Sequence, residues 1–197
     1  MMQKKVQIIS DGSLDLSQEL TKEKDIEVVP FYVSFDSETY QKEMVEVGVR
    51  EFYQEMVDHP TVFPKTSMPS VHDYYEVFEK HAKEKMPVIC ICITKKFSGS
   101  LQSATTAKDM ILEEYPDAQI TVIDSTVNTV LQGLYVLEAC RLRDMGLEYQ
   151  QIVDALLPIR ETGRIFFTIG SRGYDKGIFR RSQCKTGRVQ LLHRLWI

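Results

Sequence analysis

The sequence predicts an α/β fold, a three-layer sandwich around a mainly parallel sheet. Short apolar runs alternate with longer segments in which apolar residues recur every three or four positions, the pattern of strand–helix units. The run 88–93 is apolar at every position, as expected for a strand covered on both faces. A chain of 197 residues is long enough to bury a sizeable core.

The expected elements follow in chain order. Strands are expected at 6–9, 26–35, 88–93, 120–123 and 164–169, and Pro30 limits the second of these to an edge or a bend. Helices are expected at 17–22, 49–57, 71–85, 101–114, 128–145 and 147–159, with a loop or hairpin at 36–47. The helix at 49–57 should bury Phe52 and Met56, with Tyr53 as a further candidate. Gly146 should end the helix at 128–145.

Composition indicates an ordinary globular protein, with 43% hydrophobic and 26% charged residues. The net charge of −4 conceals an asymmetry. Residues 1–159 carry 15 Lys and Arg against 26 Asp and Glu, whereas residues 160–197 carry 9 against 2. No run has the length of a membrane span and the start does not resemble a signal peptide, so we expect a cytoplasmic protein.

The cysteines and histidines do not form a metal motif. Cys90 and Cys92 lie two apart in an expected strand, so both thiols should point to one face and stay buried and reduced. A zinc site would need clustered partners at ligand spacing, which the sequence lacks.

Two hydroxyl-rich segments precede expected helices. In segment 64–70, Ser70 and Asp73 have the spacing of a capping box, and Thr66 and Ser67 should lie in a loop facing the helix N-terminus. In segment 97–104, Ser98 and Ser100 supply hydroxyls, and Gly99 lets a ligand come close to the backbone. The two segments could share one small anion. Helix capping alone is the other interpretation, and the two are compatible.

Further polar residues should meet at the same edge of the sheet. Asp11, Ser98, Asp124 and Ser125 fall at the carboxyl ends of expected strands, where α/β proteins bind ligands. The segment around Thr66 should reach this edge. Asp11 and Asp15 could coordinate a cation, although capping and turn hydrogen bonds are the commoner role.

Two other functions compete with anion binding. A metal-assisted hydrolase or phosphotransfer enzyme would use Asp11, Asp15 and Ser98, but no histidine base is evident near Ser98 and the nucleotide-binding and esterase motifs are missing. A nucleic-acid-binding protein would use the basic tail, but the acidic body and the lack of interleaved basic and aromatic residues disfavour it.

Four motifs, in order, resemble the DegV family. They are Ser10–Leu16, Lys65–Ser70, Phe97–Ala104, and Val122–Ser125 followed by Gly133-Leu134 and Leu137–Ala139. The resemblance implies binding of a long-chain fatty acid such as palmitate between two α/β domains. It also implies that Thr66 and Ser98 bind the carboxylate, supported by Ser67, Gly99, Ser100, Asp11 and Ser125. Met68 stands where the family often has Gln.

The same resemblance implies a carrier that presents the acid to a fatty acid kinase catalytic subunit. The chain would then be no enzyme, would need no cofactor or metal, and would bind no nucleic acid. We also consider transient contact with a membrane surface.

The resemblance fades after about Gly170. We therefore expect a DegV-like N-terminal domain at 1–160 and a truncated or altered start of the second domain at 161–197. A short variant with a genuine basic tail is the rival interpretation. Truncation would remove one wall around the acyl chain, which predicts that fatty acid binds weakly or not at all and that the chain self-associates through an uncovered apolar face.

Overall fold

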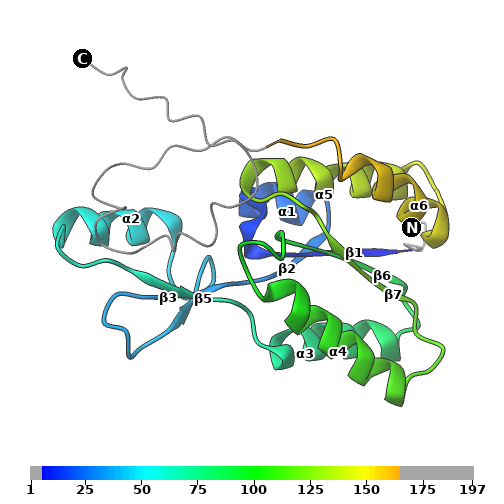
Figure 1. Cartoon of the computed structure of the whole chain (residues 1–197), viewed down its shortest axis with the longest axis horizontal. Helices are drawn as coiled ribbons and strands as arrows, with labels where there is room; N and C mark the ends of the chain where they lie inside the picture. The colour runs from blue at the N-terminus through cyan, green and yellow to red at the C-terminus, as the bar shows by residue number, and fades with distance from the viewer. Residues whose placement is uncertain (1–5, 165–197) are drawn as a thin grey trace. The chain divides into compact units, whose positions relative to one another are not determined.

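A four-stranded parallel sheet lies at the centre of the described part of the protein. The computed structural model describes residues 6–164. The strands lie in the order β2-β1-β6-β7, as Figure 1 shows. Their bounds are Gln7–Asp11 for β1, Ile26–Val29 for β2, Val88–Cys92 for β6 and Ile120–Asp124 for β7.

Helices cover both faces of this sheet and make the predicted three layers (Figure 1). One face carries α3 (Val71–Lys83) and α4 (Ser100–Glu114). The other carries α1 (Gln18–Glu23), α5 (Thr129–Asp144) and α6 (Tyr149–Ile159). The predicted α/β fold class is therefore confirmed. Gly146, at φ +84°, ends α5 as expected.

The strands send alternate side chains to two separate cores. The face toward α5 and α6 holds Ile8, Ile89, Ile91 and Ile123, and the face toward α3 and α4 holds Ile9, Val88, Cys90 and Cys92. The sulfurs of Cys90 and Cys92 are 3.8 Å apart, buried and reduced, as predicted. Cys140 is also a buried free thiol, whereas Cys184 lies outside the described residues.

Pro30 separates two strands that the sequence predicted as one. A proline has no N–H for a strand ladder. The run 26–35 accordingly breaks into β2 of the parallel sheet and β3 (Tyr32–Ser34) of a second sheet. That sheet has the order β4-β3-β5, is antiparallel, and includes β4 (Gln41–Lys42) and β5 (Lys65–Ser67). The expected loop or hairpin at 36–47 thus contains the end of the β3–β4 connection, strand β4 and the residues that follow it.

Helix α2 (Val49–Asp58) forms where predicted, but the expected burial of its apolar side chains is wrong. None of its residues is buried, and Tyr53 is 61% exposed. Phe52 is half-buried against Phe35, with ring centroids 5.2 Å apart. Periodicity identified the apolar face of α2 but not what covers it, because the helix lies beside the small sheet and off the parallel one (Figure 1).

The chain up to Gly163 forms one compact unit. The predicted strand 164–169 and the predicted second-domain segment 161–197 fall almost wholly outside the described residues. The domain boundary at 160 therefore stays a prediction.

Candidate functional site

The predicted polar residues lie at the carboxyl edge of the parallel sheet. Asp11 is the last residue of β1, Asp124 is the last residue of β7, and the segment containing Ser98 connects β6 to α4. Because neighbouring strands of this sheet are parallel, their carboxyl ends share one edge.

The two hydroxyl-rich segments touch each other through Met68 and Gly99. A Cβ built on Gly99 would lie 2.6 Å from the Met68 sulfur and 3.1 Å from its methyl carbon. Any side chain at position 99 would therefore displace Met68. Thr66 is two residues before this contact and Ser98 is one residue before it, so the contact brings the two predicted ligand hydroxyls into the same region.

The Ser98 hydroxyl is oriented by the start of α4. The backbone N–H of Ser100 donates to Ser98 Oγ at 3.1 Å. This bond occupies a lone pair, and within residues 6–164 the Ser98 hydroxyl proton has no hydrogen-bond acceptor. Gly99 is the N-cap of α4 and makes no side-chain cap. The half-buried Ser98 can therefore donate a hydrogen bond to an incoming acceptor.

Thr66 lies in strand β5 and not in the predicted loop. It pairs with Val33 of β3, and its side chain is exposed. Its neighbour Ser67 pairs with Tyr32, so the two side chains point to opposite faces of the small sheet. Within the described part of the chain the Thr66 hydroxyl makes no hydrogen bond.

The N-terminus of α3 is already occupied by the protein's own carboxylate. Ser70 and Asp73 form the predicted capping box, with Ser70 Oγ accepting from the Asp73 N–H at 3.1 Å and Asp73 Oδ2 accepting from the Ser70 N–H at 2.8 Å. Tyr32 also donates to Asp73, at 2.7 Å. The predicted capping box is therefore confirmed, whereas the loop predicted for Thr66 and Ser67 is strand β5.

Charge and hydrogen bonds hold Asp73 in its ionised form. Burial alone would raise its pKa, but hydrogen bonds from Ser70, Tyr32 and Lys42 outweigh burial and lower the pKa. Lys42 Nζ is 3.3 Å from Asp73 Oδ1. Of the two helix starts that follow the hydroxyl segments, the start of α4 is the one without a carboxylate cap.

Asp11, which is fully buried, is the centre of a polar network beneath the start of α4. Its Oδ2 accepts from the backbone N–H of Ile93 at 2.8 Å and from the Ser100 hydroxyl at 2.7 Å. Its Oδ1 accepts from Gln132 Nε2 at 2.8 Å and from the Ser13 N–H at 3.4 Å. Burial raises the pKa of Asp11 and these hydrogen bonds oppose the rise.

This arrangement disfavours a metal at Asp11. Both carboxylate oxygens already accept hydrogen bonds, and Asp15 serves instead as the C-cap of the short 3₁₀ helix η1 (Gly12–Leu14). Within residues 6–164 no group of three or more His, Cys, Asp or Glu side chains could hold a metal ion. The capping interpretation of Asp11 is confirmed, since its side chain accepts from Ser13 at the start of η1.

Sequence reasoning missed two members of the network. Gln132 of α5 is fully buried and also donates to Ser10 Oγ at 3.0 Å, while its Oε1 accepts from the Ser13 hydroxyl at 2.6 Å. Tyr74 of α3 contacts Ser100 Oγ through its hydroxyl at 2.6 Å. The only sequence signal was a glutamine among the apolar positions of the helix at 128–145.

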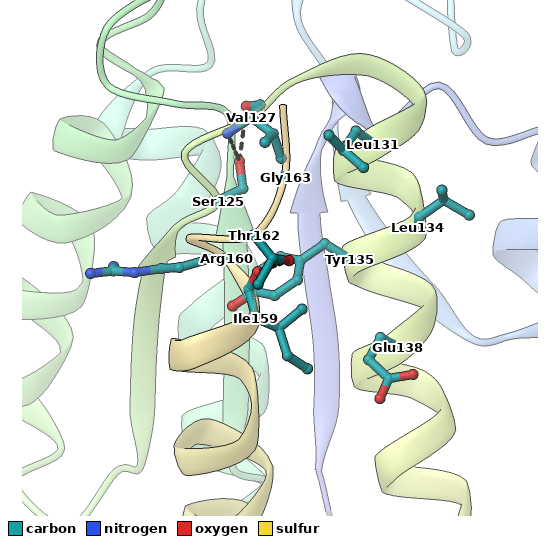
Figure 2. Close-up of a pocket in the computed structure, with 10 residues that line it drawn as sticks. All are labelled: Ser125, Val127, Leu131, Leu134, Tyr135, Glu138, Ile159, Arg160, Thr162 and Gly163. Carbon is teal, nitrogen blue, oxygen red and sulfur yellow. Dashed lines mark hydrogen bonds between the residues drawn. The ribbon is translucent and has the colours of Figure 1, made fainter. Parts of the chain in front are cut away.

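Ser125 serves a turn and lines a separate pocket. Its hydroxyl donates to the Val127 carbonyl at 2.9 Å and accepts from the Val127 N–H at 3.3 Å. Figure 2 shows the pocket, which holds about 130 Å³ between α5 and the end of α6. Its lining is Ser125, Val127, Leu131, Leu134, Tyr135, Glu138, Ile159, Arg160, Thr162 and Gly163. Pockets for drug-sized ligands usually reach about 300 Å³ or more, so a long acyl chain would not fit here.

Exposed apolar side chains gather in the segment that contains α2 and the first hydroxyl segment. They are Tyr40, Val45, Val49, Tyr53, Met56, Val57, Phe63 and Met68. Within residues 6–164 no helix combines the length and hydropathy that crossing a bilayer requires.

A family model, solved structures and curated proteins all match most of this chain. The model of the DegV family, whose members are described as uncharacterised, matches residues 5–174. A solved protein from Eubacterium ventriosum, described as binding stearic acid, is 46% identical with a TM-score of 0.74, covering 77% of this chain and 52% of that chain. A DegV family protein from Thermus thermophilus, whose structure is described as showing fatty acid binding, is 29% identical with a TM-score of 0.67, covering 80% and 54%.

Among curated relatives, a DegV domain-containing protein of Clostridium acetobutylicum is 33% identical over 153 residues. The match covers 78% of this chain and 53% of that protein. The chain thus spans about half the length of the relatives it matches.

Proposed function

Because the chain belongs to the DegV family, we propose that it binds a long-chain fatty acid and holds the acid's carboxylate with the hydroxyls of Thr66 and Ser98. Similar proteins support the ligand class, since one is described as binding stearic acid and another as binding fatty acid. Palmitate is an acid of the same class and is our candidate ligand.

The observation that carries this proposal is the contact between Met68 and Gly99. It joins two segments that are about 30 residues apart in sequence, and each contributes a hydroxyl whose proton has no acceptor within residues 6–164. A carboxylate accepts hydrogen bonds through two oxygens, so one oxygen can accept a hydrogen bond from the Thr66 hydroxyl and the other from the Ser98 hydroxyl.

Hydrogen bonds to the head group orient the acid, and the acyl chain supplies most of the affinity. A hydrogen bond to a charged group contributes about 1.5–3 kcal/mol. Each buried CH₂ contributes about 0.8 kcal/mol, so an acyl chain of fatty acid length outweighs the head group. Met68, which is 44% exposed, offers the acyl chain an apolar surface beside the head group. We retain the proposal that five further residues support the carboxylate site: Ser67, Gly99, Ser100, Asp11 and Ser125.

We infer that the protein carries the acid and does not transform it. A serine nucleophile needs a base, and each described histidine is paired with a glutamate instead: His81 bonds Glu27 at 2.6 Å, His59 bonds Glu55 at 2.8 Å, and His72 lies 3.4 Å from Glu76. The partner in this proposal is a fatty acid kinase catalytic subunit, which would phosphorylate the presented carboxylate. A cytoplasmic location and transient contact with a membrane surface belong to the same proposal.

Native mass spectrometry of the purified chain tests the ligand class. Because weak binding is predicted, we expect a minor population that carries the mass of a common long-chain fatty acid, and this population should be reduced in Thr66→Ala and Ser98→Ala. Thr106→Ala, which removes a half-exposed hydroxyl further along α4, is the matched control and should retain the ligand. A bound metal, or equal retention by all variants, would contradict the proposal.

A further inference from the structure

The buried network connects Asp11 to Ser98 through a single intermediate, Ser100. Ser100 is fully buried at the first position of α4. Its hydroxyl lies 2.7 Å from Asp11 Oδ2, and its backbone N–H lies 3.1 Å from Ser98 Oγ. One residue therefore contacts both the buried carboxylate and the hydroxyl that we propose as a ligand.

Fixed donors determine the direction of every hydrogen bond in this network. The Ile93 N–H and the Gln132 NH₂ group can only donate, so Asp11 accepts on both oxygens. The Ser100 hydroxyl donates to Asp11 Oδ2. Tyr74, whose hydroxyl is 2.6 Å from Ser100 Oγ, must then donate to Ser100.

The same directions fix the remaining proton of the site. The Ser100 N–H donates to Ser98, and this bond leaves the Ser98 proton as the group that a ligand can accept. The Asp11 carboxylate is held from two sides of the sheet. Asp11 ends the central strand β1, and Gln132 of α5 approaches it from the helical layer opposite α4. Rotation of the buried Asp11 carboxylate would break hydrogen bonds that offset its desolvation. The carboxylate therefore resists rotation.

We propose that Asp11 and Ser100 are positioning residues for the carboxylate site: Asp11 fixes Ser100, and Ser100 fixes the Ser98 hydroxyl so that it donates to the ligand. This inference rests on the proposed function. Neither residue touches the ligand, and both act through Ser98. We call the series Asp11–Ser100–Ser98 the relay. Thr66 belongs to another segment and does not depend on it.

A double-mutant cycle with a soluble probe tests the relay. The probes are octanoate and the uncharged 1-octanol, titrated into the full chain while the backbone amides of Gly99 and Leu101 are followed by NMR. Ser100→Ala should weaken octanoate binding roughly five- to tenfold, about one hydrogen bond. It should have the same effect in the Thr66→Ala background and no effect in the Ser98→Ala background. Affinity for 1-octanol should not change.

Different outcomes separate the failures. If Ser100→Ala weakens binding equally in all three backgrounds, or weakens octanol and octanoate alike, then Ser100 is only structural and the inference is overturned. If Ser98→Ala leaves octanoate binding by the otherwise unchanged protein intact, then the proposed head-group site is wrong, and the inference falls with it. Thermal unfolding followed by circular dichroism checks that each variant is folded.

A polarity exchange at Asp11 provides a second test. In Asp11→Asn, the new NH₂ group faces another donor in either orientation of the amide, the Gln132 NH₂ group or the Ile93 N–H. Asp11→Asn combined with Gln132→Glu restores a donor–acceptor pair in the same volume. Octanoate affinity should fall in the single variant and recover in the double variant. Full affinity in a folded Asp11→Asn single variant would contradict the relay.

Discussion

The sulfur of Met68 lies 2.6 Å from the position that a Cβ on Gly99 would take. This contact joins β5 and its following turn to the start of α4. A side chain at position 99 would push the end of Met68 aside, even though the backbone there, at φ −80°, suits any residue.

Gly99→Ala should reduce fatty acid binding more than it reduces stability. The atoms that the new methyl group meets are the flexible end of a partly exposed side chain, so we expect a loss of less than about 1 kcal/mol in the free energy of unfolding. Displacing Met68 should nevertheless separate the two hydroxyl segments. Octanoate titration and urea denaturation measure the two effects. In a Met68→Ala background the added methyl group should cost no further affinity, and a Gly99→Ala variant with unchanged affinity would contradict the account.

Gly133→Ala should destabilise the fold strongly. A Cβ at Gly133 would lie 2.4 Å from the backbone carbonyl oxygen of Leu14 and 2.8 Å from a Leu16 methyl carbon. Backbone cannot move aside as a methionine tip can, so we expect a loss of about 1–3 kcal/mol despite the better helix propensity of alanine. Gly48→Ala is the control, because nothing lies within 4 Å of its added methyl group. Equal urea midpoints for the two variants would refute this packing.

Removing the capping box should weaken α3. Ser70→Ala deletes the hydroxyl that accepts from the Asp73 N–H. We expect a loss of about 1 kcal/mol, and a larger loss for Asp73→Ala, which also leaves Tyr32 and Lys42 without their shared acceptor. Chemical denaturation measures both changes. An Asp73→Ala variant no less stable than Ser70→Ala would show that the outer contacts contribute nothing.

Asp36 should titrate well below an ordinary aspartate. Backbone N–H groups of Thr39 and Glu38 and the Ser34 hydroxyl bond its carboxylate and lower its pKa from 3.8 to about 2. Since the folded-state pKa is the lower one, the stabilisation is fully present above pH 3.8 and disappears as the pH falls toward 2. Carboxyl-detected NMR should give the low value, and Asp36→Asn should remove this part of the acid dependence. A pKa near 3.8 would mean that the turn does not hold the carboxylate.

Structural features that depend only on residues close together in the sequence could be predicted from it. Ser70 and Asp73 are three positions apart, so their capping box was visible as spacing, and Pro30 marked the break between β2 and β3. Gln132 and Asp11 are 121 positions apart. Their hydrogen bond depends on how α5 lies across the sheet, and no spacing rule contains that information.

The errors have physical causes of the same kind. Thr66 was expected in a loop because its segment is rich in hydroxyls and proline, but backbone pairing with β3 draws it into a strand. The start of α3 was expected to attract a ligand carboxylate, but Asp73 supplies a carboxylate from within the helix. For Thr66 a partner distant in sequence decided the outcome, whereas Asp73 lies three residues from Ser70 and its capping role was already visible as spacing.

The most direct test of the central claim is a crystal structure of this chain with bound stearate. The account predicts that the stearate carboxylate lies within about 2.5–3.0 Å of both Thr66 Oγ1 and Ser98 Oγ, beside the Met68–Gly99 contact. A carboxylate beyond hydrogen-bonding distance of both hydroxyls, for example in the pocket lined by Ser125 and Tyr135 (Figure 2), would contradict it.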